Sequence, residues 1–248
     1  MEQNKKTFGL IGKNISYSFS RKYFTEKFVL EILPKNSYEN FDIQSIEEFP
    51  SIIKNNPQLN GLNVTIPYKK IVIPYLDKLS KNAKTIGAVN VIRFTKKGKL
   101  KGYNSDFYGF MKSLKPLLQS HHQKALILGT GGASKGVAFA LAKLGIVYTF
   151  VSRDDKEGMI AYENINESTF EEYQIIINCT PLGTSPKTEE FPPIPYQFFT
   201  EKHIAFDLIY NPEITQFLKK AKEHGATVKN GSEMLVLQAE KSWEIWNK

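Results

Sequence analysis

The sequence contains a single cysteine, Cys179, so no disulfide can form within the chain. It also lacks an uninterrupted apolar stretch of the roughly 18–20 residues that a membrane-spanning helix needs. At the amino terminus, Glu2, Lys5 and Lys6 precede only a short apolar run, Phe8–Ile11, which is not a signal-peptide pattern. These absences predict a soluble, cytoplasmic protein with no membrane partner.

Histidine is scarce as well, and its four positions (His121, His122, His203 and His224) do not have the spacing of metal ligands. No metal site is therefore expected, and His121 and His122, just before a strand, are expected to be exposed loop residues. Cys179 follows an apolar run and has no histidine near it in sequence. It is interpreted as a small buried packing residue and not as a catalytic thiol.

The net charge of +8 is positive, yet the basic residues are dispersed. They occur as short pairs at Lys5–Lys6, Lys69–Lys70, Lys96–Lys97 and Lys219–Lys220, without an arginine-rich segment or a basic helix. This pattern argues against a nucleic-acid partner. It favours anionic small molecules, such as a nucleotide phosphate or a carboxylate, which a positive field attracts.

Apolar, β-rich runs alternate with helical patterns along the chain, which is typical of an α/β fold with mainly parallel sheets. Strands are expected at Thr7–Ile11, Ser37–Ile43, Leu59–Val64, Val89–Phe94, Lys99–Tyr103, Ala125–Leu128, Val147–Ser152, Tyr173–Asn178 and His203–Leu208. Helices are expected at Ser20–Leu33, Ile46–Ile53, Ser105–Leu117, Ala133–Leu144, Glu213–His224 and Glu233–Trp246. The pattern predicts two domains, residues 1–103 and 104–231, with the closing helix, 232–248, packing back on the first.

A glycine-rich segment lies between one of these strands and the helix that follows it. Ala125–Leu128 leads into Gly129, Thr130, Gly131, Gly132, Ala133 and Ser134. Glycines let the backbone approach a pyrophosphate closely, and the helix amino terminus offers free N–H groups. The strand, loop and helix together predict a Rossmann-type dinucleotide site, whereas a glycine pattern alone would be weak evidence.

The end of the next strand carries the residues that distinguish NADP from NAD. In Rossmann folds an acidic residue there binds the ribose 2′-hydroxyl of NAD, whereas arginine pairs with the 2′-phosphate of NADP. Arg153, in the segment Ser152–Lys156, favours NADP. Asp154 and Asp155 favour NAD, so NADP is the preferred prediction and NAD the alternative.

Two polar clusters in the first half have both a structural and a chemical interpretation. Lys69, in Asn63–Lys69, could be a solvated surface lysine, and Asp106 could simply favour the first turn of a helix. Hydride transfer between an alcohol and a nicotinamide, however, also requires a group that moves the hydroxyl proton. A dinucleotide site therefore gives Lys69 and Asp106 a joint catalytic interpretation.

Further polar or glycine-containing segments are Ile86–Asn90, Asn178–Gly183, Asp207–Pro212 and Gly231–Gln238. Together with Asn63–Lys69, Asn104–Asp106 and Gly129–Ser134, they resemble, in order, the motifs of the shikimate dehydrogenase family. The resemblance covers essentially the whole chain. It implies an NADP-dependent oxidoreductase that reduces 3-dehydroshikimate to shikimate in aromatic amino acid biosynthesis, with residues 1–103 binding substrate and 104–231 binding NADP.

The resemblance also implies individual roles. Lys69 is the acid–base residue, assisted by Asp106. The implied substrate-binding residues are Ser18, Ser20, Thr65, Asn90, Asp106, Tyr210 and Gln238. The implied cofactor-binding residues, beyond the glycine loop, are Ser152, Arg153, Asp154, Thr180, Ile209 and Gly231.

The chain departs from the family pattern where the histidine before the first substrate serine is replaced by Tyr17, and where Arg21 follows Ser20 in place of proline. Two alternatives stay open beside the main prediction: an NAD-dependent quinate/shikimate dehydrogenase, and a non-catalytic binding protein on the same fold. A monomer and a homodimer are both compatible with the sequence.

Overall fold

The computed structural model describes residues 5–16, 18–154 and 156–248, and the chain divides into two compact units. Unit 1 comprises Met1–Ser105 and Ala239–Lys248, and unit 2 comprises Asp106–Gln238. The boundary predicted from sequence, after residue 103, lies close to this division. Of the closing helix, only the part from Ala239 onward belongs to unit 1, whereas the sequence pattern predicted that all of 232–248 would pack there.

Unit 1 is built on a six-stranded sheet in the order β2-β1-β3-β5-β6-β4. Its strands are β1 (Lys6–Gly12), β2 (Asn36–Asp42), β3 (Leu59–Val64), β4 (Lys78–Leu79), β5 (Val91–Phe94) and β6 (Leu100–Tyr103). Its helices are α1 (Phe19–Leu30), α2 (Phe49–Asn55) and α3 (Lys81–Ile86), with 3₁₀ helices at Ile46–Glu48 and Ile73–Tyr75. β1, β2 and β3 are parallel, and β5 is antiparallel to both β3 and β6.

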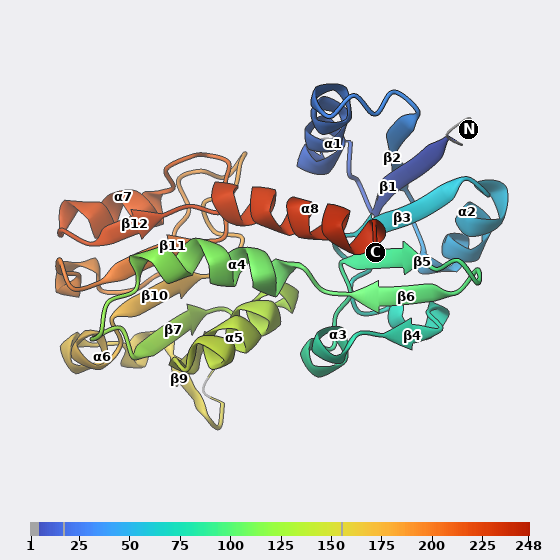
Figure 1. The fold of residues 1–248 in the computed structure, drawn as a ribbon. Helices are drawn as coiled ribbons and strands as arrows, with labels where there is room; N and C mark the ends of the chain where they lie inside the picture. The colour runs from blue at the N-terminus through green and yellow to red at the C-terminus, as the bar shows by residue number, and fades with distance from the viewer. Residues whose placement is uncertain (1–4, 17, 155) are drawn as a thin grey trace. The chain divides into compact units, whose positions relative to one another are not determined.

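Each face of this sheet buries its own hydrophobic cluster. Leu62 and Ile92 belong to the cluster on one face. On the other face Phe8 and Phe24 pack with Trp246, from the carboxyl-terminal end of α8 (Ser232–Trp246). Figure 1 shows α1 lying beside β1 and β2. The apolar residues at the end of the closing helix are therefore part of the core of unit 1.

Unit 2 contains a second six-stranded sheet, in the order β12-β11-β10-β7-β8-β9. Its strands are β7 (Lys124–Leu128), β8 (Val147–Ser152), β9 (Met159–Ala161), β10 (Ile175–Asn178), β11 (Ile204–Asp207) and β12 (Thr227–Lys229). Its helices are α4 (Asp106–Leu114), α5 (Gly132–Leu144), α6 (Glu167–Glu172), α7 (Gln216–Glu223) and α8 as far as Gln238, with 3₁₀ helices at Lys115–Leu117, Tyr162–Asn164 and Tyr196–Phe198.

All neighbouring strands of this sheet are parallel. The chain starts at β7, moves outward through β8 and β9, and then continues from β10 on the other side of β7. The strand order thus reverses between β7 and β10. In open parallel sheets, ligands bind beside the carboxyl ends of the strands at such a reversal.

The strongest helix prediction is confirmed by α5. It begins at Gly132, and Gly145 ends it with a φ of 76°, a left-handed conformation that glycine adopts without a steric penalty. In the described part of the chain, no helix has the length and apolar character needed to cross a membrane.

Two local predictions are wrong. Ser20 does not cap the first helix, because α1 begins at Phe19 after Ser18 and ends at Leu30, ahead of the predicted Leu33. His122 is buried, not exposed: its Nδ1 accepts a hydrogen bond from the Gln119 N–H at 2.9 Å, and its Nε2 lies 3.0 Å from the Lys202 carbonyl oxygen. The His122 ring thus closes the loop before β7.

Candidate active site

One edge of the unit 1 sheet collects the polar segments found in the sequence. β1 and β3 are parallel, so the loops that follow them start at the same edge. β5 runs the opposite way, which brings its first residues to that edge, and the antiparallel β6 ends there. Asn90, just before β5, therefore lies next to the end of β3, and its carbonyl oxygen accepts from the Val64 N–H at 2.9 Å.

The turn after β3 presents Thr65 and Lys69 at this edge. The Thr65 N–H donates to the Ile11 carbonyl at 2.9 Å, and the Val89 N–H donates to the Lys69 carbonyl at 2.7 Å. The Ile66–Pro67 peptide bond within the turn is cis. Both Thr65 and Lys69 are partly exposed. Backbone hydrogen bonds at each end thus fix the main chain that carries the two side chains.

Two buried asparagine side chains form hydrogen bonds that hold the segments at this sheet edge together. Asn63 accepts from the Tyr38 hydroxyl at 2.8 Å and donates to the Ser242 hydroxyl at 3.0 Å. The Asn90 side chain donates to the Ser105 hydroxyl at 3.0 Å and accepts from the Ser105 N–H at 2.6 Å. Asn90 is 3 % exposed, so these bonds orient its amide and also hold the last residue of unit 1 before Asp106.

The loop after β1 starts at the same sheet edge and carries Ser18, and Ser20 lies in the first turn of α1, which follows it. The Asp42 carboxylate anchors this loop by accepting from the Asn14 N–H at 2.9 Å and the Ile15 N–H at 3.1 Å. Ser18 and Ser20 are both half-buried. Tyr17 lies outside the described residues.

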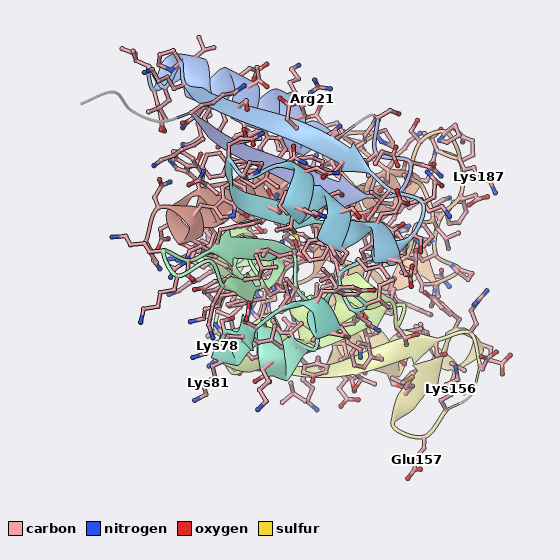
Figure 2. All side chains as sticks on the ribbon, turned by 90° about the vertical axis from the view of Figure 1, so that its right-hand side faces the viewer. Arg21, Lys78, Lys81, Lys156, Glu157 and Lys187 are labelled. Carbon is pink, nitrogen blue, oxygen red and sulfur yellow. The ribbon has the colours of Figure 1, made fainter. Side chains whose placement is uncertain are left out.

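The positive charge of Arg21, close to these serines in sequence, is partly compensated by a carboxylate. Its Nη2 lies 3.8 Å from a Glu39 carboxylate oxygen, and its side chain is 59 % exposed. Figure 2 shows Arg21 on α1 at the surface of unit 1. The charge that replaces the family's proline is therefore directed to solvent and to Glu39.

In unit 2 a pocket of about 580 Å³ lies at the reversal between β7 and β10. The loops after β7, β8 and β10 form most of its wall. Its lining residues are Gly129, Thr130, Gly131, Val151, Ser152, Arg153, Asp154, Lys156, Tyr162, Cys179, Thr180, Pro181, Leu182 and Pro193. Seven of the predicted cofactor residues are among them: Gly129, Thr130, Gly131, Ser152, Arg153, Asp154 and Thr180.

The glycine loop has the geometry that a dinucleotide phosphate requires. Gly129 has a φ of +96°, and a Cβ there would lie 3.0 Å from the Thr180 side chain. A Cβ on Gly131 or Gly132 would meet nothing within 4 Å, so the backbone before α5 faces open space. The first N–H groups of α5 have no partner within the helix, which makes this open space suitable for a phosphate.

Part of the predicted cofactor set is not in the wall of this pocket. Ser134 is fully buried, and its hydroxyl donates to the Gly131 carbonyl at 2.7 Å. This hydrogen bond stabilises the loop. Gly132, Ala133, Ile209 and Gly231 are also absent from the lining residues.

The end of β8 supplies a cation to the pocket rim. Arg153 lines the pocket, and the Asp154 carboxylate lies 3.2 Å from the Lys156 Nζ. This ion pair partly neutralises the acidic residue that favoured NAD. The buried Tyr162 hydroxyl in the same wall has no hydrogen-bond partner in the described parts of the chain. Asp155 lies outside the described residues.

A buried carboxylate that the sequence reasoning gave no role organises the next two strand ends. Asp207 accepts from the Thr215 hydroxyl at 2.6 Å, from the Ile209 N–H at 3.0 Å and from the Asn178 side chain at 3.1 Å. Burial raises its pKa to about 6, against the opposing effect of these hydrogen bonds. An acidic residue directly after the apolar run Ile204–Phe206 was the available sequence signal.

Asn178 extends this network to the pocket, because its Oδ1 accepts from both the N–H and the hydroxyl of Thr180, at 3.0 and 2.6 Å. Farther along, the Gly231 N–H donates to the Ile209 carbonyl at 3.0 Å, and a Cβ on Gly231 would lie 2.2 Å from the Leu208 carbonyl oxygen. These contacts bring the predicted Ile209 and Gly231 together and require glycine at position 231.

The remaining predicted residues lie on helices or loops of unit 2. Asp106 is the first residue of α4, and a Cβ on Gly136 of α5 would lie 3.9 Å from the Asp106 Cβ. The candidate catalytic carboxylate thus sits beside the helix that begins at the glycine loop. Gln238 is largely buried, and its amide donates to the Leu235 carbonyl at 2.9 Å. Tyr210 is 38 % exposed.

Cys179, which the sequence predicted to be a buried packing residue, is only half-buried. It lies in the pocket wall, where burial raises the pKa of its thiol and disfavours the nucleophilic thiolate. Within the described ranges, no group of three or more His, Cys, Asp or Glu side chains could hold a metal ion.

Comparison with known proteins assigns this arrangement to a family. The model of the shikimate dehydrogenase substrate-binding domain matches residues 10–92. A curated NADP(+) shikimate dehydrogenase of Methanosphaera stadtmanae is 37 % identical over 257 residues, covering 96 % of this chain and 90 % of the relative.

Solved structures agree with this assignment. Shikimate dehydrogenase of Aquifex aeolicus has a TM-score of 0.86 and 33 % identity, covering 100 % of this chain and 94 % of the other. The Thermus thermophilus enzyme, solved with NADP(H) and shikimate, has a TM-score of 0.83 and 31 % identity, with 97 % and 93 % covered. The similarity extends over both units, so this chain belongs to the shikimate dehydrogenase family.

Proposed function

We propose that this chain catalyses the reversible, NADP(H)-dependent interconversion of 3-dehydroshikimate and shikimate. Unit 1 binds the substrate, and unit 2 binds the cofactor. The observation that carries the proposal is the gathering of Thr65, Lys69 and Asn90 at one sheet edge of a chain whose other unit has a glycine-loop pocket. The proposal holds for a monomer or a homodimer and places the reaction in the cytoplasm.

The pocket at the reversal of the unit 2 sheet would hold the cofactor, which supplies hydride when it is bound. Backbone N–H groups at Gly131 and Gly132 would donate hydrogen bonds to the pyrophosphate, and Arg153 would pair with the 2′-phosphate. Asp154 is compatible with a phosphate at this rim because Lys156 lies within ion-pair distance of its carboxylate. The residues present therefore fit NADP(H).

Lys69 moves the proton. In the direction of reduction, its Nζ donates a proton to the substrate carbonyl oxygen, and in the direction of oxidation it accepts the hydroxyl proton. Asp106 orients the ammonium group. Ser18 and Ser20 donate hydrogen bonds to the substrate carboxylate, whereas Thr65, Asn90 and Gln238 bind the ring hydroxyls. Tyr210 would complete the carboxylate end, and Ile209 and Gly231 would hold the nicotinamide.

The decisive experiment measures initial rates at the nicotinamide absorbance band, with shikimate and with quinate, each in the presence of NADP⁺ and NAD⁺. We expect the highest kcat/KM for shikimate with NADP⁺. Dominant turnover of quinate with NAD⁺ would replace the proposal by the quinate/shikimate dehydrogenase alternative that Asp154 raises.

A non-catalytic binding protein is distinguished by the variant Lys69→Met, which removes the proton and keeps an unbranched side chain. We expect kcat to fall by at least about 100-fold, the low end for general acid–base catalysis, while most of the substrate affinity remains. Lys70→Met is the matched control, because Lys70 is the exposed neighbour in the same turn. An unchanged kcat in Lys69→Met would remove Lys69 from the chemistry.

A further inference from the structure

Basic residues gather at one surface of unit 1, most of them from the single segment 93–101. They line a groove of about 710 Å³, which we call the basic groove. It is lined by Lys6, Asn60, Lys78, Arg93, Phe94, Thr95, Lys96, Lys97, Lys99, Leu100, Lys101, Trp246, Asn247 and Lys248. Eight of these residues are lysine or arginine, and among the described residues that line the groove none is acidic.

Three of the cations form a row across neighbouring strands. Arg93 of β5 is the direct register partner of Lys101 of β6, and Lys101 is also the register partner of Lys78 of β4. Register partners place their side chains on the same face of a sheet, with adjacent strands about 4.8 Å apart. Like charges directly opposite one another destabilise strand pairing, so this row has a cost in the isolated chain.

The chain itself provides little to offset this charge. Lys101 and Arg93 lie 5.3 and 6.0 Å from the centroid of the Tyr103 ring, and these are weak cation–π contacts. Of the eight cations, Lys248 is the one with an ion pair in the described residues, at 2.9 Å from Glu244. Lys6, Lys78, Lys96, Lys97 and Lys99 are exposed, and their ammonium groups have no ion pair with a carboxylate of the described residues.

Trp246 and the β5–β6 hairpin both contribute residues to the wall of the groove. Trp246, the last residue of α8, packs so closely on β3 that a Cβ on Gly61 would lie 2.2 Å from its ring, and its indole N–H donates to the Ile92 carbonyl at 3.1 Å. The β5–β6 hairpin, with Gly98 at a φ of +71°, contributes Lys96, Lys97 and Lys99. Asp77 accepts from the Leu100 N–H at 2.8 Å and thus places a negative charge beside one end.

We propose that the basic groove binds a small polyanion carrying two or more phosphate groups. The row of three cations spans two inter-strand spacings, about 10 Å, which suits a short chain of phosphates. A long polymer would have to pass the carboxylates of Asp77 and Glu244 at the groove margins. A volume of this size is typical of small-molecule sites. The site shares no lining residue with the glycine-loop pocket.

The test is calorimetric titration of the full chain with sodium tripolyphosphate, first without NADP⁺ and then with saturating NADP⁺, so that the nucleotide pocket is filled in the second titration. We expect one saturable site whose affinity falls as salt is added. The groove variant is Lys78→Gln with Arg93→Gln and Lys101→Gln. An exposed ion pair contributes up to about a five-fold factor to an equilibrium constant, so this variant should bind on the order of ten- to a hundred-fold more weakly.

The matched control carries the same charge change at exposed lysines of unit 1 outside the groove: Lys54→Gln, Lys81→Gln and Lys84→Gln. Figure 2 shows Lys81 and the groove residue Lys78 on the same unit. We expect the control to bind within about three-fold of the parent chain. Arg93→Lys, which preserves the charge and the fold, should also retain the affinity.

Four results would overturn the proposal. The first two are no saturable binding of tripolyphosphate, and equal weakening of its binding in the groove variant and the control. The other two are loss of tripolyphosphate binding when NADP⁺ is added, and tighter binding of a single-stranded oligonucleotide than of tripolyphosphate at equal phosphate concentration. Equal weakening in both variants would mean that tripolyphosphate is attracted by the net charge of the chain alone and not by the basic groove. Competition by NADP⁺ would assign the anion to the nucleotide pocket, and the oligonucleotide result would mean that the groove binds an extended polymer. None of these results depends on whether the chain turns over shikimate.

Discussion

The buried Asp207 should make the stability of unit 2 depend on pH in an unusual direction. Its side chain is fully buried at the end of β11, and burial raises its pKa to about 6 from the ordinary value of 3.8. The folded chain therefore holds the Asp207 proton more tightly than the unfolded chain does. The stability that this proton contributes is fully present below the unfolded pKa of 3.8 and is lost as the pH rises through about 6.

The magnitude follows from the difference between the two pKa values. About two pH units at about 1.4 kcal/mol each correspond to about 3 kcal/mol of unfolding free energy lost between about pH 4 and pH 7. The three hydrogen bonds from Thr215, Ile209 and Asn178 already oppose this loss, because they favour the carboxylate. Without them the ionised form would be costlier still.

Asp207→Asn tests this reasoning, since asparagine has nearly the same shape and does not ionise. Both tryptophans, Trp243 and Trp246, belong to unit 1, so tryptophan fluorescence would not report on unit 2. Amide hydrogen exchange of β10 and β11 measures the opening free energy where Asp207 lies. Comparing parent and variant from about pH 4 to 7.5 cancels the titration of all other groups.

We expect the parent chain to lose about 3 kcal/mol relative to Asp207→Asn across this range. Glu163→Gln is the control, because Glu163 is an exposed acid of the same unit. It should follow the pH profile of the parent. Parallel profiles for the parent and Asp207→Asn would refute the reasoning, because they would mean that Asp207 ionises equally in the folded and unfolded chains.

Three further predictions concern other positions. Gly61→Ala should lower the melting temperature of the tryptophan fluorescence transition, because its Cβ would overlap the Trp246 ring, and overpacking of this kind costs about 1–3 kcal/mol. Burial lowers the pKa of His203, whose Nδ1 accepts from the Thr200 N–H, so NMR titration should find a pKa below the ordinary 6.5. The stability of unit 2 should then fall as the pH drops below 6.5, and a measured pKa above 6.5 would contradict this. Arg153→Leu removes the cation that would pair with the 2′-phosphate, so it should raise the KM for NADP⁺ at least about ten-fold and leave the KM for NAD⁺ nearly unchanged. Equal effects on the two KM values would exclude a contact between Arg153 and the 2′-phosphate.

Long, regular elements could be predicted from the sequence. β7 and β10 are largely buried, mainly apolar runs, and α5 combines a continuous helical pattern with a glycine stop. Short elements were missed, among them α3 and α6, with six residues each, and the edge strands β4, β9 and β12. Their few residues carry too little periodicity, and tertiary contacts determine whether they form.

The end of α1 shows how a local backbone turn displaces a predicted boundary. The helical pattern continues to Leu33, but Ile32 has a φ of 54°, and the Leu33 N–H turns back to the Phe28 carbonyl at 2.8 Å. His122 was mispredicted for a different reason. Its burial depends on the Lys202 carbonyl, 80 positions away, and no local pattern encodes such a partner.

The same limit applies to the candidate site. The glycine loop and Arg153 could be found because strand, loop and helix are consecutive in sequence. Ser134 was assigned to the cofactor by its place in the loop, yet its hydroxyl caps the Gly131 carbonyl. Asp207 received no role, because its three donors come from three separate segments.

The placement of Asn90 and Asn104 shows which features of a site follow from the order of the elements alone. Gly98 marks a hairpin, and a hairpin makes its two strands antiparallel. A residue just before the first strand and a residue just after the second must then lie at the same sheet edge, as Asn90 and Asn104 do. The turn after β3 reaches that edge because β3 is antiparallel to β5. Strand order and direction therefore bring Lys69 and Asn90 together, whereas the hydrogen bonds that orient their neighbours require the folded chain.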